Sequence, residues 1–185
     1  MKQTSPVRSL ARSAMIAAVY AALTMALPVL SYGPIQLRFS EALTVLPFFL
    51  PEAIPGLFVG CVLANLLSSF GMADVILGSL ATLLAALWTS RMKNPWLAPL
   101  PPVISNMVIV GGMIAWFEAG GFGAGFLPAW LYNGTTVAIG ELAACYVLGM
   151  LLLYVLPGIP SVSRYLTPEQ MDKLPRRTAQ ASRQV

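Results

Sequence analysis

The chain has 185 residues, of which 57% are apolar and only 10% are charged, and its mean hydropathy is +0.75. Soluble domains carry roughly 25% charged residues, so this composition excludes an ordinary soluble domain and indicates an integral membrane protein. The net charge is +4, and the basic residues gather at the ends of apolar stretches and in the C-terminal tail. This distribution indicates membrane topology and contact with the lipid bilayer, and it argues against nucleic-acid binding.

Six apolar stretches follow one another along the chain. They are residues 11–30, 41–50, 54–70, 73–90, 99–117 and 128–156. A helix needs about 20 residues to span a bilayer, and four of the stretches reach that length comfortably. The second and third stretches together have only about 30 residues, so they form either two short tilted helices or one broken hairpin, with the break at residues 51–56. We therefore predict an all-α six-helix transmembrane bundle over residues 1–156, with short second and third helices, and a polar, poorly ordered tail over 157–185.

Basic residues next to membrane spans are retained on the cytoplasmic side, so their positions predict the orientation of the bundle. If the N-terminus is cytoplasmic, Arg38 is the one basic residue that falls outside. All the others then fall inside, which are Lys2, Arg8, Arg12, Arg91, Lys93, Arg164, Lys173, Arg176, Arg177 and Arg183. Both termini are therefore predicted to be cytoplasmic.

The first stretch carries small residues at a helical spacing. Ala14, Ala18 and Ala22 are four residues apart, with Ala17 and Ala21 alongside, so one side of this helix is smooth enough for another helix to approach closely. Packing within the protein itself explains such a stripe equally well.

Four polar residues fall in the outer half of the predicted bundle. Arg38 and Glu41 precede and begin the second stretch, Asn65 lies near the outer end of the third, and Asp74 follows in the next turn. They are candidates for a ligand pocket. The alternatives are a surface ion pair between Arg38 and Glu41, and an interhelical hydrogen bond for Asn65.

The fifth and sixth stretches hold the remaining candidates. Asn106 lies nearer the cytoplasmic end of its helix and is either a pocket residue or an interhelical hydrogen-bonding group. Glu141 lies well inside the last stretch, where a charge costs about 2.5–3.5 kcal/mol, so it is a candidate ligand or ion site, with a protonated structural carboxyl as the alternative. Trp130 and Asn133 share its helical face, together with Gly134 and Val137. Trp130 is a pocket candidate or an interfacial anchor.

Several classes of chemistry have no support in the sequence. Histidine is absent, and Cys61 and Cys145 lie within predicted spans, where small apolar roles are expected and neither a disulfide nor a metal site is. A phosphate-binding glycine loop with Lys and Ser or Thr is also absent, so the chain is not expected to hydrolyse ATP, to hold a cofactor or to be an enzyme.

Five strings together resemble a known family. They are GPIQLRFSEALTVLPF, PEAIPGLFVGCVLANLL, DVILGSLATLLAAL, LAPLPPV and GELAACYVLG. They are similar to the QueT family, the queuosine-precursor substrate-binding subunits (S components) of energy-coupling factor transporters, from about Ala11 to Leu156. The resemblance implies a subunit of the bacterial plasma membrane that captures a 7-deazaguanine such as preQ0, preQ1 or queuine from outside. It also implies a membrane coupling protein, which the Ala14, Ala18 and Ala22 stripe would contact, and two cytoplasmic ATPases as partners.

The candidate residues suit that substrate class. The pyrimidine edge of a 7-deazaguanine presents two adjacent N–H donors, which a carboxylate such as Glu141 accepts. Arg38 could contact O6, and Trp130 could stack on the ring. An aminomethyl precursor would favour a second carboxylate, Glu41 or Asp74, whereas a nitrile precursor would not, and the sequence leaves this choice open. An autonomous ion-coupled transporter, with Glu141 as a proton relay, and a membrane-embedded enzyme or scaffold are the alternative classes.

Overall fold

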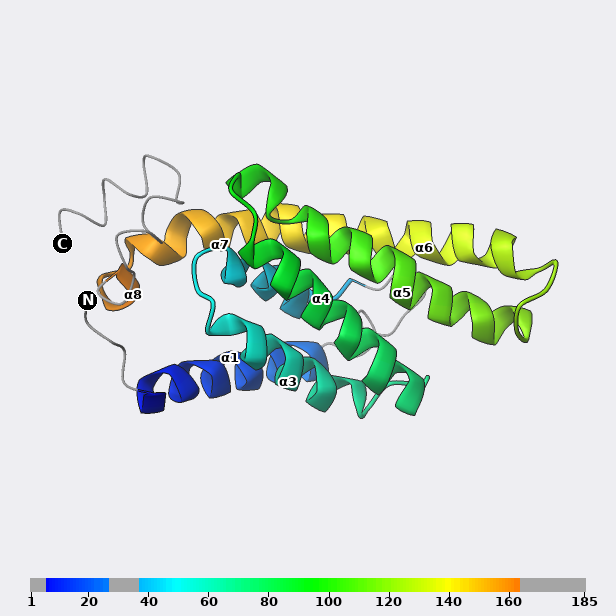
Figure 1. Cartoon of the computed structure of the whole chain (residues 1–185), viewed down its shortest axis with the longest axis horizontal. Helices are drawn as coiled ribbons and strands as arrows, with labels where there is room; N and C mark the ends of the chain where they lie inside the picture. The colour runs from blue at the N-terminus through cyan, green and yellow to red at the C-terminus, as the bar shows by residue number, and fades with distance from the viewer. Residues whose placement is uncertain (1–5, 27–36, 164–185) are drawn as a thin grey trace.

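The computed structural model describes residues 6–26 and 37–163, and every regular element within these ranges is helical. Its elements are drawn in Figure 1. In chain order they are α1 (Pro6–Ala26), η1 (Phe39–Phe48), α3 (Ala53–Asn65), η2 (Asp74–Gly78), α4 (Ser79–Ser90), η3 (Pro95–Leu97), α5 (Leu100–Ala119), α6 (Phe126–Leu142), η4 (Ala143–Gly149), α7 (Met150–Val155), η5 (Leu156–Gly158) and α8 (Pro160–Ser163). Elements η1, η3 and η5 are 3-10 helices, and η2 and η4 are π-helical. The all-helical prediction is confirmed for these residues.

Successive helices run in alternating directions through the bundle. An ion pair of 3.3 Å between Arg12 and Glu52 joins the start of α1 to the turn after η1. At the opposite end, the rings of Phe70 and Phe117, 5.6 Å apart, join the turn after α3 to the end of α5. The beginning of α1 and the end of the α6–α7 rod consequently lie at the same end of the molecule (Figure 1). Placement of this end in the cytoplasm stays a prediction.

Within residues 6–26 and 37–163, three helical segments are long and apolar enough to cross a membrane, namely Pro6–Ala26, Pro95–Ala119 and Phe126–Gly158. The predicted short second and third helices are present, because η1 has 10 residues and α3 has 13. Each is about 20 Å long, less than the roughly 30 Å of a bilayer core. The break between them spans residues 49–52 and so comes earlier than the predicted 51–56. Pro55 falls within the first turn of α3, where a missing N–H costs no helical hydrogen bond. Whether all six segments cross the membrane stays a prediction.

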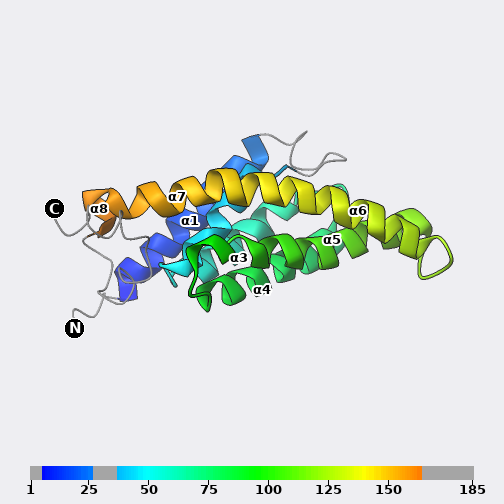
Figure 2. The same cartoon turned by 90° about the horizontal axis from the view of Figure 1, so that it is seen from above.

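Glycines let two helix pairs approach closely. A Cβ atom on Gly60 of α3 would lie 2.8 Å from the carbonyl oxygen of Ala17 on α1, and one on Gly111 of α5 would lie 2.6 Å from the Cα of Gly134 on α6. The α5–α6 hairpin extends beyond the other helices in both views of the molecule (Figures 1 and 2), and α6, η4 and α7 form one continuous rod (Figure 2).

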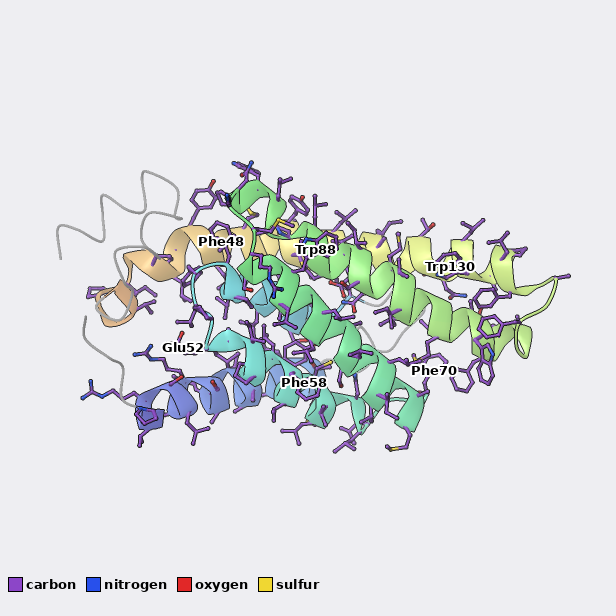
Figure 3. The ribbon with its side chains drawn as sticks, viewed as in Figure 1. Phe48, Glu52, Phe58, Phe70, Trp88 and Trp130 are labelled. Carbon is purple, nitrogen blue, oxygen red and sulfur yellow. The ribbon has the colours of Figure 1, made fainter. Side chains whose placement is uncertain are left out.

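Two apolar clusters stabilise the bundle. One lies toward the end of the molecule where α1 begins and includes Tyr20, Phe48 and Leu57. The other lies toward the hairpin and includes Val110 and Val137. Figure 3 shows Phe48 and Phe70 well apart along the long axis of the molecule, with Phe70 on the side of the hairpin. Asn106 on α5 and Glu141 on α6 are buried and fall between these two clusters, and this level is where the candidate site lies, whereas the buried Asn133 lies beyond Val137 toward the hairpin.

Candidate ligand-binding site

Arg38 is the first residue of a buried polar group in the middle of the bundle. Its side chain is 6% exposed, and its Nη2 lies 3.2 Å from Oδ2 of Asp74, which is 1% exposed. Asp74 begins the π-helical segment η2, where the ladder of hydrogen bonds is locally widened, a feature frequent at functional sites. Because its ion pair is with Asp74 and is buried, the surface pair with Glu41 considered from the sequence is not the arrangement found.

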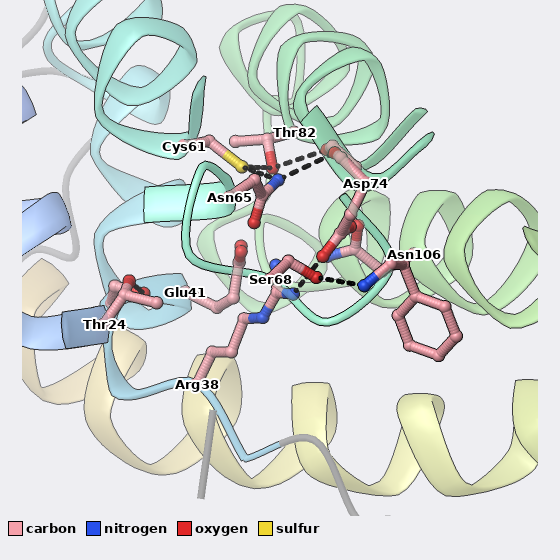
Figure 4. Close-up of polar contacts among 12 residues, drawn as sticks. Thr24, Arg38, Glu41, Cys61, Asn65, Ser68, Asp74, Thr82 and Asn106 are labelled. Atoms are coloured by element: carbon pink, nitrogen blue, oxygen red, sulfur yellow. Dashed lines mark hydrogen bonds and ion pairs between the residues drawn. The ribbon is translucent and has the colours of Figure 1, made fainter. Parts of the chain in front are cut away.

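Glu41 and Asn65 lie beside this ion pair, as Figure 4 shows. The Glu41 Oε1 accepts a hydrogen bond from the Tyr20 hydroxyl. The Asn65 Nδ2 donates to the carbonyl oxygen of Asp74 at 2.9 Å and lies 3.3 Å from the Cys61 sulfur. Both residues are buried, and Asn65 therefore acts in part as the interhelical hydrogen-bonding group that the sequence allowed.

Glu41, Asn65 and Asp74 each have one side-chain polar atom with a hydrogen-bond partner in the described part of the protein and a second polar atom without one there. Among the described residues, Glu41 Oε2, Asn65 Oδ1 and Asp74 Oδ1 are buried without a hydrogen-bond partner. We call these three side chains the open acceptor group. A buried polar atom without a partner costs about 1–3 kcal/mol, so three in one place indicate a site that a ligand or ordered water completes.

Glu141 lies in a second part of the same polar interior, where the contacts are closed. Its Oε1 accepts a 2.6 Å hydrogen bond from Asn106 Nδ2, and its Oε2 lies 3.5 Å from the Cys145 sulfur. We call Asn106, Glu141 and Cys145 the closed network. Cys145 also lies 3.4 Å from the carbonyl oxygen of Glu41, which places the closed network beside the open acceptor group.

Asn106 thus lies beside Glu141 and the open acceptor group, although its position in the sequence predicted a different depth in the bundle. It lies in the first third of α5, and the sequence placed it toward the cytoplasmic end while the others were placed in the outer half. The α5–α6 hairpin extends beyond the other helices (Figure 1), so the early part of α5 is level with the C-terminal ends of α1 and α3.

Trp130 and Asn133 are not brought to this site. Asn133 donates a 2.6 Å hydrogen bond to Glu118 near the end of α5, and the Trp130 Nε1 donates to the carbonyl oxygen of Val108 at 3.3 Å. Trp130 precedes Glu141 by eleven residues on α6, a distance of about 16 Å along the helix. Both residues hold the hairpin together and lie too far along it to share a small ligand with Glu141.

An apolar hollow of about 490 Å³ lies beside the hairpin and is distinct from the polar site. Its lining residues are Ala73, Leu77, Gly112, Met113, Trp116, Phe117, Phe122 and Phe126. Its lining side chains are apolar apart from the Trp116 indole N–H, so this hollow is poorly suited to orienting a polar ligand.

The alanine stripe on α1 is on the surface. Ala14, Ala18 and Ala22 are exposed, while Ala17 and Ala21 are buried. Internal packing therefore uses the second set of alanines, since Ala17 faces Gly60 of α3, and it leaves the first set available to another helix.

Some residues of the polar interior gave no signal in the sequence, and one gave a weak signal. Tyr20 is a single aromatic residue in an alanine-rich helix, and Thr44, whose Oγ1 donates to the Glu41 carbonyl oxygen, resembles any threonine in an apolar run. Cys145 follows Glu141 by four residues, a spacing that puts both on one helical face and could have linked them. Among the described residues, no group of three or more His, Cys, Asp or Glu could hold a metal ion.

Long apolar helices around a buried polar centre are the architecture of a membrane protein that handles a small polar molecule. The QueT transporter family model matches residues 10–157, and the chain therefore belongs to the QueT transporter family. It is also similar to the queuosine precursor transporter QueT of Lactococcus lactis subsp. cremoris (strain MG1363), with 47% identity over 89 residues. That alignment covers 45% of this chain and 52% of the relative, so about half the length of the relative is matched. No solved structure matches the chain.

Proposed function

We propose that this protein is the substrate-binding S component of an ATP-driven energy-coupling factor importer, and that it captures a 7-deazaguanine queuosine precursor from outside the bacterial plasma membrane. The observation that carries the proposal is the open acceptor group, a buried set of polar atoms without protein partners, in a chain of the QueT transporter family. Both termini are cytoplasmic in this proposal, as the charge distribution predicts.

The closed network and Arg38 are proposed to form hydrogen bonds with the 7-deazaguanine ring of the ligand. A carboxylate has about four acceptor positions, so the contacts of Glu141 with Asn106 and Cys145 leave room for the two N–H groups of the pyrimidine edge. The guanidinium of Arg38, which carries five N–H donors and lies beside Asp74, is proposed to contact the O6 carbonyl of the ligand. Trp130 has no role at the ring in this arrangement.

The coupling protein is proposed to contact α1 through Ala14, Ala18 and Ala22. Small residues permit close approach of two helices in a membrane, and these three are exposed while the opposite side of α1 packs on α3. Two cytoplasmic ATPases would supply the energy, since the sequence carries no phosphate-binding loop of its own.

The proposal is tested by separating capture from transport with Ala18→Leu. The added bulk should block the helix contact, so assembly with the coupling protein should fail and ATP-dependent uptake should fall at least about tenfold, while the purified subunit keeps its affinity for the ligand. Ala143→Leu is the matched control, because Ala143 is also an exposed alanine but lies on η4, and it should change neither property. Mass spectrometry of the small molecule that co-purifies with the protein identifies the ligand.

Two results would contradict the proposal. Loss of ligand binding in the isolated Ala18→Leu subunit would assign the stripe to the fold or the pocket. Uptake in cells that lack the coupling protein and the ATPases would instead support an autonomous ion-coupled transporter with Glu141 as its proton relay.

A further inference from the structure

The open acceptor group has a particular chemical deficiency. Its unpartnered atoms are carboxylate and amide oxygens, which accept hydrogen bonds and donate none. The amide orientation of Asn65 follows from its contacts, because Nδ2 donates to the Asp74 carbonyl oxygen and Oδ1 therefore faces the site. What these atoms lack is hydrogen-bond donors.

The same region is also short of positive charge. The buried ionisable carboxyl groups are Glu41, Asp74 and Glu141, and the described buried residues include a single basic side chain, Arg38. Residues 27–36, LPVLSYGPIQ, contain no charged residue that could add a cation. Removing unbalanced charges from water is costly unless opposite charge joins them, so a ligand with a positive group is favoured.

The three side chains are held in place before any ligand arrives. Glu41 is fixed by Tyr20, Asp74 by Arg38, and Asn65 by the backbone of Asp74. Gly78 provides the space for the Asp74 carboxylate, because a Cβ there would overlap Asp74 Oδ1 and lie 2.8 Å from Asn65 Nδ2. Acceptors fixed in this way bind a matching donor without a further ordering cost.

We propose that Glu41, Asn65 and Asp74 together bind the ammonium of an aminomethyl group, so that the protein selects 7-aminomethyl-7-deazaguanine over the nitrile precursor. An ammonium supplies three N–H donors and one positive charge, which match the three unpartnered acceptors and the surplus of carboxylates. A nitrile supplies neither donor nor charge. This inference rests on the proposed function, and it adds which precursor the site takes.

The test compares ligands by calorimetry on the purified full chain in nanodiscs. The probes are 7-aminomethyl-, 7-hydroxymethyl- and 7-cyano-7-deazaguanine, which keep one ring and change only the substituent. The aminomethyl compound should bind at least about 100-fold more tightly than the nitrile, because hydrogen bonds to charged groups are the strong ones, and the neutral hydroxymethyl compound should fall between them.

Glu41→Gln then assigns the preference to this group. The amide keeps the shape and an acceptor for Tyr20 but removes the charge, so affinity for the aminomethyl compound should fall at least about tenfold while affinity for the nitrile changes less than about threefold. Retained nitrile binding shows that the variant is folded. If the variant does not fold, the ligand comparison on the unmodified protein decides the question by itself.

Equal or tighter binding of the nitrile would overturn the inference and leave the proposed function standing. The inference would also be overturned, with the proposed function left standing, if the preference for the aminomethyl compound survived in both Glu41→Gln and Asp74→Asn. Binding of the nitrile that requires sodium would have the same consequence, because a metal ion would then occupy the acceptors. Failure of all three compounds to bind the folded protein would overturn the proposed function and the inference together.

Discussion

The two acidic parts of the polar interior lie side by side but differ in how their contacts are completed. In the closed network, both oxygens of Glu141 have contacts within the protein, from Asn106 and from Cys145. In the open acceptor group, Glu41, Asn65 and Asp74 each have one atom bound by the protein and one without a partner. Contacts made within the protein stabilise the fold before a ligand binds, whereas buried atoms without a partner cost stability that a bound ligand restores.

This difference teaches that an intramembrane carboxyl group is not informative by itself. Glu141 is the outstanding charge in the sequence, yet its neighbours in the structure already meet part of its hydrogen-bonding capacity. Glu41 resembles one half of a surface pair in the sequence, yet it is 1% exposed and has an unpartnered oxygen. Partners that come from other parts of the chain decide how much of each carboxyl group remains available to a ligand.

The largest effect is expected from Arg38→Met, which removes the one described basic partner of the open acceptor group. Asp74 would be left as an uncompensated buried charge, and breaking one side of a buried pair costs about 3–5 kcal/mol in the free energy of unfolding. Chemical denaturation of the purified protein measures this loss. Arg12→Met is the matched control, because its pair with Glu52 is more exposed, at 14% and 18%, and should contribute about 1 kcal/mol or less. Similar losses in the free energy of unfolding of the two variants would contradict the expectation that the buried Arg38–Asp74 pair matters more for stability than the Arg12–Glu52 pair.

Smaller changes in the free energy of unfolding of the ligand-free protein should distinguish the closed network from the open acceptor group, because one substitution is expected to destabilise the protein and the other is not. Asn106→Leu leaves Glu141 Oε1 without its donor and should destabilise the ligand-free protein by about 1–3 kcal/mol. Glu41→Gln should leave the ligand-free protein unchanged or slightly more stable, because it neutralises a buried group that is not fully satisfied. Denaturation without ligand checks both variants. Equal destabilisation by the two changes would show that the open acceptor group is also structural.

The sequence predicted the framework of the fold but not the depth of each residue. Apolar length and the Pro and Gly residues at 51–56 predicted short second and third helices, and these are present as η1 and α3. Helical periodicity correctly placed Asn133 and Glu141 on a buried face of α6. It could not predict what lies opposite that face at each level, since this depends on how far the α5–α6 hairpin extends and which helices pack beside it.

Tyr20 and Asp74 illustrate the same limit from other helices. The Tyr20 hydroxyl reaches Glu41 because α1 and η1 lie side by side, and the Asp74 carboxylate reaches Arg38 because η2 folds back over residues 36 positions earlier. Such contacts between distant segments leave no regular spacing in the chain. A pattern within one helix therefore identifies candidate polar residues, and only the packing groups them into a site.

The smallest effect is expected from Trp130→Phe, and it tests whether depth along α6 matters as much as the helical face. The substitution keeps an aromatic ring next to Phe126, whose ring centroid is 6.3 Å away, and removes the indole N–H that donates to Val108. Since Trp130 lies about 16 Å from Glu141 along the helix, ligand affinity should change by less than about twofold. Tyr20→Phe is the matched aromatic control, because it removes the hydroxyl that fixes Glu41, and it should weaken ligand binding several-fold by calorimetry. A tenfold loss in Trp130→Phe would move the ligand to the hairpin and would make the indole ring, instead of the buried acceptors, the centre of recognition.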